Sequence, residues 1–170
     1  MTTRARLSGS RRLLLAAMAA GVVGAGLAAL PEPRVARADD EAADDVTFLH
    51  PLDNTPLEFT LRPDQEITPA VEAFHRTPEN PYRGDPEAIA AGERLYRQWC
   101  QACHMPDGSG RMGPSLIDDA WRYPRTGTDQ GMFEIIYAGG AGAMQAFGRR
   151  MDQDDILKVM AHIDTLRGND

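Results

Sequence analysis

The sequence contains little that would fix a fold through covalent cross-links or a β-sheet. Its 170 residues include only two cysteines, so a framework of several disulfides is excluded. No stretch alternates apolar and polar residues in the way that a half-buried strand requires. Basic residues are also in the minority, with 18 Lys and Arg against 25 Asp and Glu. This charge balance argues against nucleic acid or an anionic lipid surface as the partner.

The longest apolar run lies in the N-terminal segment. Four arginines precede residues 13–30, which carry no charge, and Ala36-Arg37-Ala38 forms a small-x-small processing site. This order is typical of a secretory signal peptide, so we expect residues 1–38 to be removed on export to the periplasm. A retained membrane anchor is the alternative, because the run is long enough to span a bilayer, but its richness in Ala and Gly favours cleavage.

Removal of residues 1–38 leaves about 130 residues, enough for one domain with a modest core. These residues carry 12 basic and 24 acidic side chains, a formal charge of −12. Such an acidic chain favours encounter with a basic face on a protein partner, although solubility alone is an alternative explanation. We expect residues 39–82 to form an acidic tail and then an irregular arm. Seven prolines between Phe48 and Pro86, the last of them Pro86 itself, exclude long regular elements there.

Four helices are predicted after the arm begins. Thr68 and Asp85 each precede a proline, as at a helix N-terminus, and predict helices over 69–75 and 86–99. A third helix begins at residue 128 or 129 and ends at Gly139-Gly140. The last, over 152–166, has a stripe formed by Ile156, Val159, Met160, Ile163 and Leu166.

The predicted fold class is therefore all-α, with the main domain at residues 83–170. Long loops join the short helices at 105–128 and 139–151, and such helices bury little apolar area. A small exported domain of this kind usually recruits disulfides, a metal or a prosthetic group to complete its core.

The two cysteines stand together in the stretch WCQACHMPDGSGRMGP, residues 99–114. A disulfide between Cys100 and Cys103 would close too short a loop to stabilise the fold much. A redox-active pair of the thioredoxin type follows a strand, whereas a predicted helix precedes this pair. Zinc would need two further ligands, and the candidates are scattered along the chain at His50, His75 and His162.

Cys-x-x-Cys-His is the attachment motif of c-type haem. Its spacing lets Cys100 and Cys103 form thioethers with the two vinyl groups of one porphyrin, while His104 binds the iron. Export agrees with this interpretation, because c-type haem is attached outside the bacterial cytoplasm. We therefore expect one covalent haem c, and we expect it to serve as the missing core.

The second axial ligand of the iron is sought among the six methionines that follow the motif. Met144 is the leading candidate, because the small residues of GGAGAMQAFG let the backbone approach a porphyrin and Phe147 follows to cover the site. Met151 comes next, and His162 would give bis-histidine ligation, although a packing role suits it better. The remaining four are Met105, beside His104; Met112, in the loop after the motif; Met132, at a helix start; and Met160, on the apolar stripe. Ligation by His and Met raises the reduction potential of the iron.

These residues together resemble class I cytochromes c. Gly92 and Tyr96 match the glycine and aromatic with which the N-terminal helix of that family crosses the C-terminal helix. Pro114 matches a proline beside the carbonyl that orients the proximal imidazole, and Met144 with Phe147 matches the distal Met-Pro-x-Phe, with glutamine in place of proline. The resemblance implies the class I cytochrome c fold and adds Pro114 and Phe147 to the residues expected to contact haem.

The likeness is closest to the cytochrome c-L family and covers roughly residues 46–168. Its most specific part is SLIDDAWRYPRTGTDQGMFEIIY, which general cytochromes c lack. It implies a periplasmic electron carrier, not an enzyme, that takes electrons from a methanol (alcohol) dehydrogenase containing pyrroloquinoline quinone (PQQ) and passes them to a second cytochrome c. We expect four side chains of this part either to line the haem or to pack in a loop, namely Trp121, Arg122, Tyr123 and Arg125.

Two other functions stay open at this point. A general electron-transfer cytochrome c that donates to an oxidase would share every haem residue. A catalytic haem protein such as a peroxidase would need an open iron face with acid/base groups. The sequence neither indicates nor excludes a calcium ion beside the haem.

Overall fold

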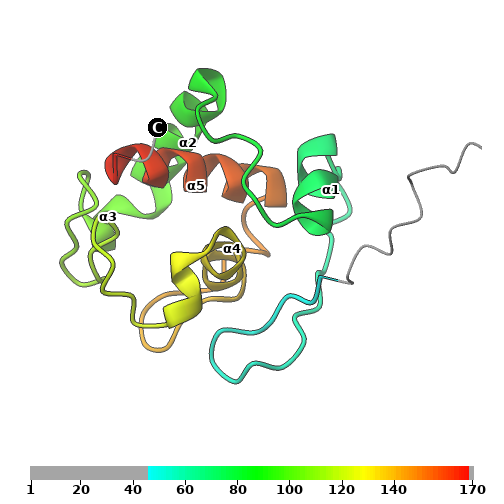
Figure 1. The fold of residues 1–170 in the computed structure, drawn as a ribbon, viewed down its shortest axis with the longest axis horizontal. Helices are drawn as coiled ribbons and strands as arrows, with labels where there is room; N and C mark the ends of the chain where they lie inside the picture. Colours follow the sequence, from blue (N-terminus) through cyan, green and yellow to red (C-terminus); the bar gives the residue numbers. More distant parts are fainter. Residues whose placement is uncertain (1–45, 169–170) are drawn as a thin grey trace, which may run out of the picture. The chain divides into compact units, whose positions relative to one another are not determined.

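The computed structural model describes residues 46–168, which belong to one compact unit (Figure 1). Its helical segments, in chain order, are α1 (Pro69–Arg76), α2 (Pro86–Trp99), α3 (Gln101–His104), η1 (Pro124–Gly127), α4 (Asp129–Ala138) and α5 (Gln153–Leu166). These residues contain no strand beyond one isolated antiparallel bridge between Leu49 and Pro56, so the all-α prediction is confirmed. No helix among them is long and apolar enough to cross a membrane. The expected signal peptide and most of the acidic tail lie outside the described residues.

The helices begin at the positions that their capping residues predict. Thr68 accepts a hydrogen bond from the Val71 N–H, and the Asp85 carboxylate accepts from the N–H groups of Glu87 and Ala88. Thr128 caps α4 in the same way, and α5 begins just after Asp152. All four predicted helices are therefore confirmed. The segments α3 and η1 were not predicted, because four residues are too few to show a period.

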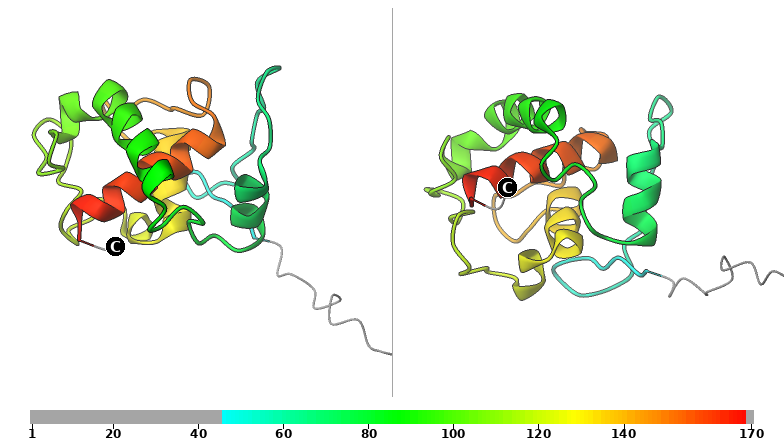
Figure 2. Two further views of the ribbon diagram at one scale, coloured as in Figure 1. Left: turned by 90° about the horizontal axis from the view of Figure 1, so that it is seen from above. Right: turned by 45° about the horizontal axis from the view of Figure 1, so that its top comes forward.

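Helices α2 and α5 cross at Gly92 (Figure 2). A Cβ atom at this position would lie 1.9 Å from the backbone carbonyl oxygen of Lys158, so the two backbones approach more closely than any side chain allows. One turn later, Tyr96 is fully buried, and its hydroxyl donates to the Met105 carbonyl at 2.8 Å. The Tyr96 ring meets the His162 ring edge-on at 5.2 Å, so an imidazole fills this part of the crossing.

We predict that Gly92→Ala destabilises the protein by about 2 kcal/mol, because the added methyl group forces the two helices apart. In a helix interior free of such contact, replacing glycine by alanine would stabilise the protein by about 0.5–1 kcal/mol. A net loss of stability therefore identifies the helix crossing as the cause. Chemical denaturation of the haem-loaded protein measures the change, with Ala90→Ser on the exposed side of α2 as the control. Unchanged or increased stability in Gly92→Ala would mean that the helices do not cross this closely.

The N-terminal arm contributes aromatic side chains to the core. The Phe48 ring lies 5.1 Å from that of Phe59, which in turn lies 5.0 Å from Tyr137 of α4. Phe74 of α1 packs at 5.0 Å against Phe133 of α4 and completes the cluster. A hydrogen bond joins the same elements, since the Thr60 backbone N–H donates to the Tyr137 side-chain hydroxyl. Residues 46–60 are therefore part of the same core as α4 and are not a loose covering.

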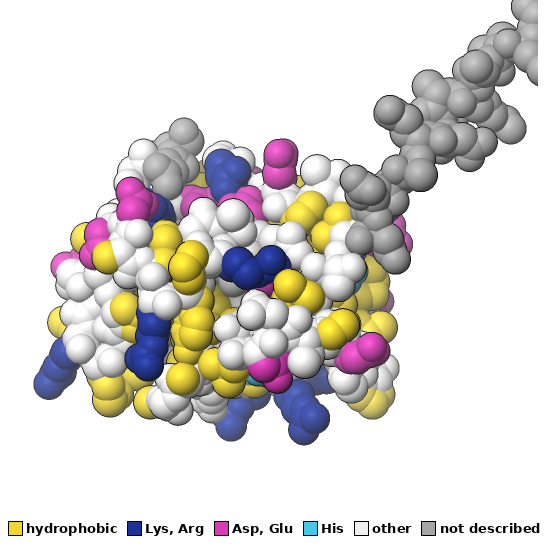
Figure 3. Space-filling model, turned by 60° about the horizontal axis from the view of Figure 1, so that its bottom comes forward, with side chains coloured by type: hydrophobic (Ala, Val, Ile, Leu, Met, Phe, Trp, Pro, Cys, Tyr) yellow, Lys and Arg dark blue, Asp and Glu magenta, His cyan; other side chains and the backbone are white. Residues whose placement is uncertain are grey.

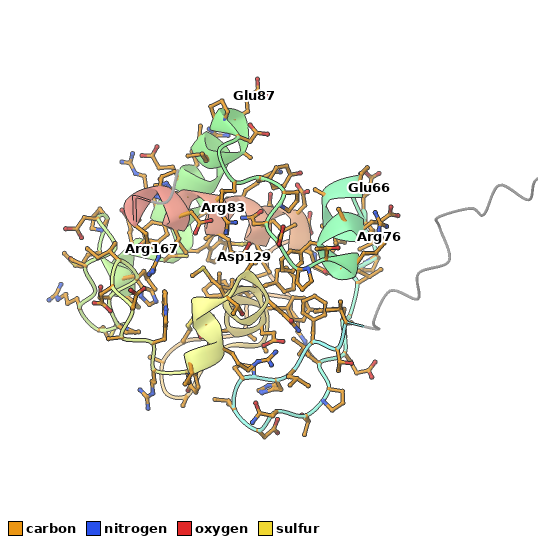
Figure 4. The ribbon with its side chains drawn as sticks, in the orientation of Figure 1. Glu66, Arg76, Arg83, Glu87, Asp129 and Arg167 are labelled. Atoms are coloured by element: carbon orange, nitrogen blue, oxygen red, sulfur yellow. The ribbon has the colours of Figure 1, made fainter. Side chains whose placement is uncertain are left out.

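An ion-pair network joins the start of α4 to the end of α5. The Arg83 guanidinium lies 2.7 Å from the Asp129 carboxylate and 3.1 Å from that of Asp164 (Figure 4). Burial raises the pKa of Asp164, and the nearby Arg83 opposes this shift by favouring the charged form. The network holds two helices in place, and the cavity described next lies between them and α3.

Candidate functional site

A cavity of about 270 Å³ is bordered by α3, α4, α5 and two loops, 112–123 and 140–147. Its lining is mostly apolar, with Ile135 and Ile136 from α4 and Val159 and Ile163 from α5. All six residues predicted from the sequence to hold a haem line it, namely Cys100, Cys103, His104, Pro114, Met144 and Phe147. The structure thus brings two distant segments of the chain to one space.

Both cysteines line the cavity because the chain stays nearly helical after α2. Cys100 has helical backbone angles between α2 and α3, and side chains three residues apart on a helix share one face. The thiols do not form a disulfide. Burial raises the pKa of Cys100 to about 12, the reverse of the lowered pKa that activates a redox pair. Among residues 46–168, no three His, Cys, Asp or Glu side chains cluster as zinc would require.

The His104 ring is buried and held in a fixed orientation. Its Nδ1 lies 2.9 Å from the Pro114 carbonyl oxygen. A carbonyl only accepts, so Nδ1 donates, and Nε2 keeps its lone pair free for a metal. A Cβ atom at Gly113 would lie within 2.6–2.9 Å of three ring atoms. Gly113 is therefore a residue that this histidine requires, and nothing in its sequence context distinguishes it from an ordinary loop glycine.

Met144 lies on a glycine-rich loop tied to the end of α4. Gly139 adopts a φ of +82°, and a Cβ there would come within 2.7 Å of the Ala146 nitrogen. The Gly140 N–H donates to the Met144 carbonyl at 3.0 Å, which closes the turn. The Phe147 N–H donates to the Ile136 carbonyl, also at 3.0 Å. These bonds hold the half-buried Met144 side chain against the cavity, on a different segment from His104.

The other ligand candidates lie in less suitable places. Met112 and Met132 also line the cavity, but Met112 is 70% exposed and neighbours Gly113, which touches the His104 ring. Met132 is buried in the second turn of α4. The remaining candidates are absent from the cavity lining, and they are Met105, Met151, Met160 and His162. Met144 is thus the half-buried thioether on a wall separate from that of His104.

Three consecutive side chains, Trp121, Arg122 and Tyr123, line the wall between the loops, whereas Arg125 does not. Arg125 instead forms a two-pronged ion pair with the buried Glu134 carboxylate, at 2.6 and 3.0 Å. The Tyr123 hydroxyl accepts from the Ala141 N–H at 2.9 Å, so this wall is bonded directly to the Met144 loop.

Arg167 fastens the same wall to the end of α5. Its guanidinium donates to the carbonyls of Leu116 and Asp118 at 3.0 and 2.8 Å, and it pairs with the Asp119 carboxylate at 2.6 Å. It also lies 4.8 Å from the Trp121 ring centroid. Sequence reasoning missed this role. The one available signal was a cation near a helix C-terminus, which ordinarily interacts with the helix dipole alone.

These features fit a covalently attached haem. Two thiols and an oriented imidazole approach an apolar cavity from one side, and a thioether approaches on a separate loop. Glycine at position 113 leaves no side chain to displace the imidazole. The donor set of one nitrogen and one sulfur is that of haem iron in low-spin cytochromes c.

Comparison with known proteins relates the chain to one protein family and to a curated relative. Residues 87–163 match the protein family described as cytochrome C oxidase, cbb3-type, subunit III. Cytochrome c-L of Methylorubrum extorquens is 31% identical over 143 residues, which cover 84% of this chain and 73% of that protein. This match extends well beyond residues 87–163.

Two solved structures share the fold over about 70% of this chain. The crystal structure of cytochrome CL from the marine methylotrophic bacterium Methylophaga aminisulfidivorans has a TM-score of 0.69 and 37% identity, covering 71% of this chain and 80% of that chain. Cytochrome cL from Hyphomicrobium denitrificans has a TM-score of 0.67 and 33% identity, covering 70% and 72%. The fold is thus that of class I c-type cytochromes, as predicted.

Proposed function

Since the chain belongs to the cytochrome c-L family and is therefore an electron-transfer protein, not an enzyme, we propose that it accepts electrons from a PQQ-dependent methanol (alcohol) dehydrogenase. It then passes them to a second cytochrome c in the periplasm. Under this proposal residues 1–38 direct export, residues 39–82 form the tail and arm, and residues 83–170 form the haem domain.

Membership of this family implies a covalent haem c, and the cavity residues have distinct roles toward it. Cys100 and Cys103 would tether it covalently, and the Nε2 atom of His104 and the thioether of Met144 would bind its iron. When bound, the haem supplies an iron that gains and loses one electron. Pro114 keeps the His104 imidazole in the tautomer that leaves Nε2 unprotonated.

The remaining cavity side chains set the polarity of this site. The isoleucines and Phe147 form an apolar lining, and a thioether ligand would favour the reduced state relative to a second imidazole. No Asp or Glu of residues 46–168 lines the cavity, so its described walls offer no carboxylate as an acid/base group. This composition supports a carrier over the peroxidase alternative.

The observation that carries the proposal is the extent of the similarity. The likeness to cytochrome c-L includes sequence outside the haem domain, where a general cytochrome c has no counterpart to the arm. Both solved neighbours are cytochromes cL, and one comes from a bacterium described as methylotrophic. Because oxidation of an alcohol releases two electrons, each turnover of the dehydrogenase requires two encounters with this protein.

We expect a purified PQQ methanol dehydrogenase to reduce the haem-loaded protein in a reaction that requires methanol, followed as the growth of the reduced-haem absorption bands. A mitochondrial-type cytochrome c at equal concentration serves as the control and should be reduced much more slowly. Absence of methanol-dependent reduction would overturn the proposed donor.

A general carrier that donates to an oxidase is the second candidate, because residues 87–163 match a subunit family of cbb3-type oxidases. This alternative predicts rapid oxidation by an oxidase preparation together with no response to the dehydrogenase. The same two assays therefore separate the candidates.

A further inference from the structure

We propose that Tyr123 is a positioning residue for Met144, because the hydrogen bond that its hydroxyl accepts from the Ala141 N–H holds the thioether at the haem iron. The bond is 2.9 Å long and joins the residue before η1 to the loop after α4. Both Tyr123 and Met144 line the cavity. The inference rests on the proposed function, since it requires Met144 to be the sulfur ligand of the iron.

The Met144 loop has little other support around the methionine. Residues 141–143, 145 and 146 are exposed, whereas Met144 is half-buried. The Gly140 N–H donates to the Met144 carbonyl at 3.0 Å, but this bond closes the turn on itself. Within residues 46–168, the bond to Tyr123 is the one hydrogen bond that joins residues 140–146 to another segment. Its loss would therefore free the turn to move together with its methionine.

The aromatic ring of Tyr123 supports the same turn. A Cβ atom at Gly140 would lie 3.6 Å from the Tyr123 ring and 3.7 Å from the Cβ atom of Met144, both ordinary contact distances. The Gly140 backbone is therefore close to both side chains. Tyr123 thus acts on two consecutive residues of the turn, since its ring lies near Gly140 and its hydroxyl bonds to Ala141.

Tyr123 can restrain this turn because its own segment is fixed. Its carbonyl accepts a hydrogen bond from the Thr126 N–H at 2.9 Å. Two residues earlier, the Trp121 ring lies 4.8 Å from the Arg167 guanidinium, and a Cβ atom at Gly127 would lie 3.1 Å from that ring. These contacts attach the segment to the end of α5 and to η1, so the phenol oxygen is an acceptor held in a fixed place.

The bond contributes to ligation only if it breaks when the sulfur leaves the iron. Because residues 141–143 are exposed, an outward movement of the turn would transfer the Ala141 N–H to water. The net loss of one hydrogen bond corresponds to roughly a two- to twelve-fold change in an equilibrium constant. We therefore expect the Tyr123 hydroxyl to favour the sulfur-bound state over the released state by about five-fold.

Imidazole measures this preference, because it binds ferric haem iron in competition with the thioether. On the face drawn in Figure 3, hydrophobic side chains line a hollow that is open to solvent. The cavity itself has exposed lining residues at 141–143, which leave it accessible to a small neutral ring. Titration of the oxidised haem protein, followed as loss of the sulfur-to-iron charge-transfer band, gives the Kd. The rate of this loss at saturating imidazole gives the rate at which the sulfur leaves.

A matched pair of variants assigns the effect to this bond. Tyr123→Phe should keep the charge-transfer band in the absence of imidazole, but it should tighten imidazole binding by about five-fold. Tyr137→Phe is the control, since it also removes a hydroxyl that accepts from a backbone N–H at 2.9 Å, that of Thr60 in the arm. It should change the imidazole affinity by less than about two-fold. No gain in Tyr123→Phe, or an equal gain in both variants, would overturn the proposal.

Removal of the donor tests the same bond from its other end. Proline has no N–H, so Ala141→Pro abolishes the bond while Tyr123 keeps its hydroxyl. In the Ala141→Pro background, Tyr123→Phe should change the imidazole affinity by less than about two-fold, because the two substitutions remove one shared interaction. A gain as large as in the parent would show that the hydroxyl acts by another route and would overturn the proposal.

The ligand assignment, the positioning role and the electron donor fail in different ways. If the parent shows no sulfur-to-iron band, or if Met144→Ala keeps it, Met144 is not the ligand and the role of Tyr123 is overturned with it. If the band depends on Met144 but imidazole binds the parent and Tyr123→Phe equally, the positioning role alone is overturned. If PQQ methanol dehydrogenase reduces none of these proteins, the proposed donor fails, and the imidazole affinities still decide the role of Tyr123.

Discussion

Replacement of both Cys100 and Cys103 by serine yields exported protein that has no covalently bound haem. Serine keeps the size of each side chain but removes the sulfur that forms the thioether. The expected result is a colourless protein, measured by haem-linked peroxidase staining after denaturing electrophoresis and by the absorption of the purified material. Each single variant retains one sulfur and should give reduced amounts of haem protein with a shifted reduced-state band.

Loss of haem should also remove most of the stability of the fold. The cavity of about 270 Å³ would be left as an apolar void. At roughly 24 cal/mol per Å³ such a void costs on the order of 6 kcal/mol, as much as many domains possess. The double variant should therefore lose its cooperative thermal transition, measured by circular dichroism at 222 nm. A coloured double variant, or wild-type protein whose two thiols both react with iodoacetamide, would contradict haem attachment at these cysteines.

Replacement of Met144 by alanine should remove the sulfur ligand and lower the midpoint potential by on the order of 100 mV. The thioether stabilises ferrous iron, and a water or stronger donor in its place does so less well. Spectroelectrochemical titration measures the potential, and loss of the sulfur-to-iron charge-transfer band in the oxidised protein identifies the missing bond. The variant should remain folded, because Met144 is half-buried on a loop that backbone hydrogen bonds close.

Met112→Ala is the matched control for this substitution, because Met112 also lines the cavity and is more exposed. It should keep both the charge-transfer band and the parent potential. If Met112→Ala loses the band while Met144→Ala keeps it, the two sulfurs exchange roles. If neither variant loses it, Met132 becomes the ligand to test.

The four main helices could be predicted because their signals are local. A capping side chain and a proline at the next position fix each start of α1 and α2, and both act within one turn. The haem motif was equally local, since it occupies five consecutive residues. Met144 was singled out by its glycine-rich surroundings, and the structure places it on the cavity wall.

The supports of the site could not be predicted, because they join residues far apart in sequence. Gly113 is required by the His104 ring, and Arg167 bonds to a loop about 50 residues earlier. The part that the arm takes in the core could not be predicted for the same reason. The aromatic residues of 46–60 have no helical period, and only contact with α4 shows that they belong to the core.

Net charge shows a further limit of what composition can predict. The count of acidic and basic residues is a property of the sequence, but ion pairing decides which charges remain available. Arg83, Arg125 and Arg167 each pair with a carboxylate, whereas Arg111 and Arg122 have no carboxylate of residues 46–168 within 4.0 Å. Net charge therefore does not show which charged side chains remain unpaired on the surface.

The placement of the two sulfurs constrains the order of maturation. Both line a cavity that α5 borders, and α5 lies in backbone contact with α2 at Gly92. Under the proposed function, both thiols are easier to reach before α5 docks onto α2. We therefore expect haem attachment to precede docking of these two helices.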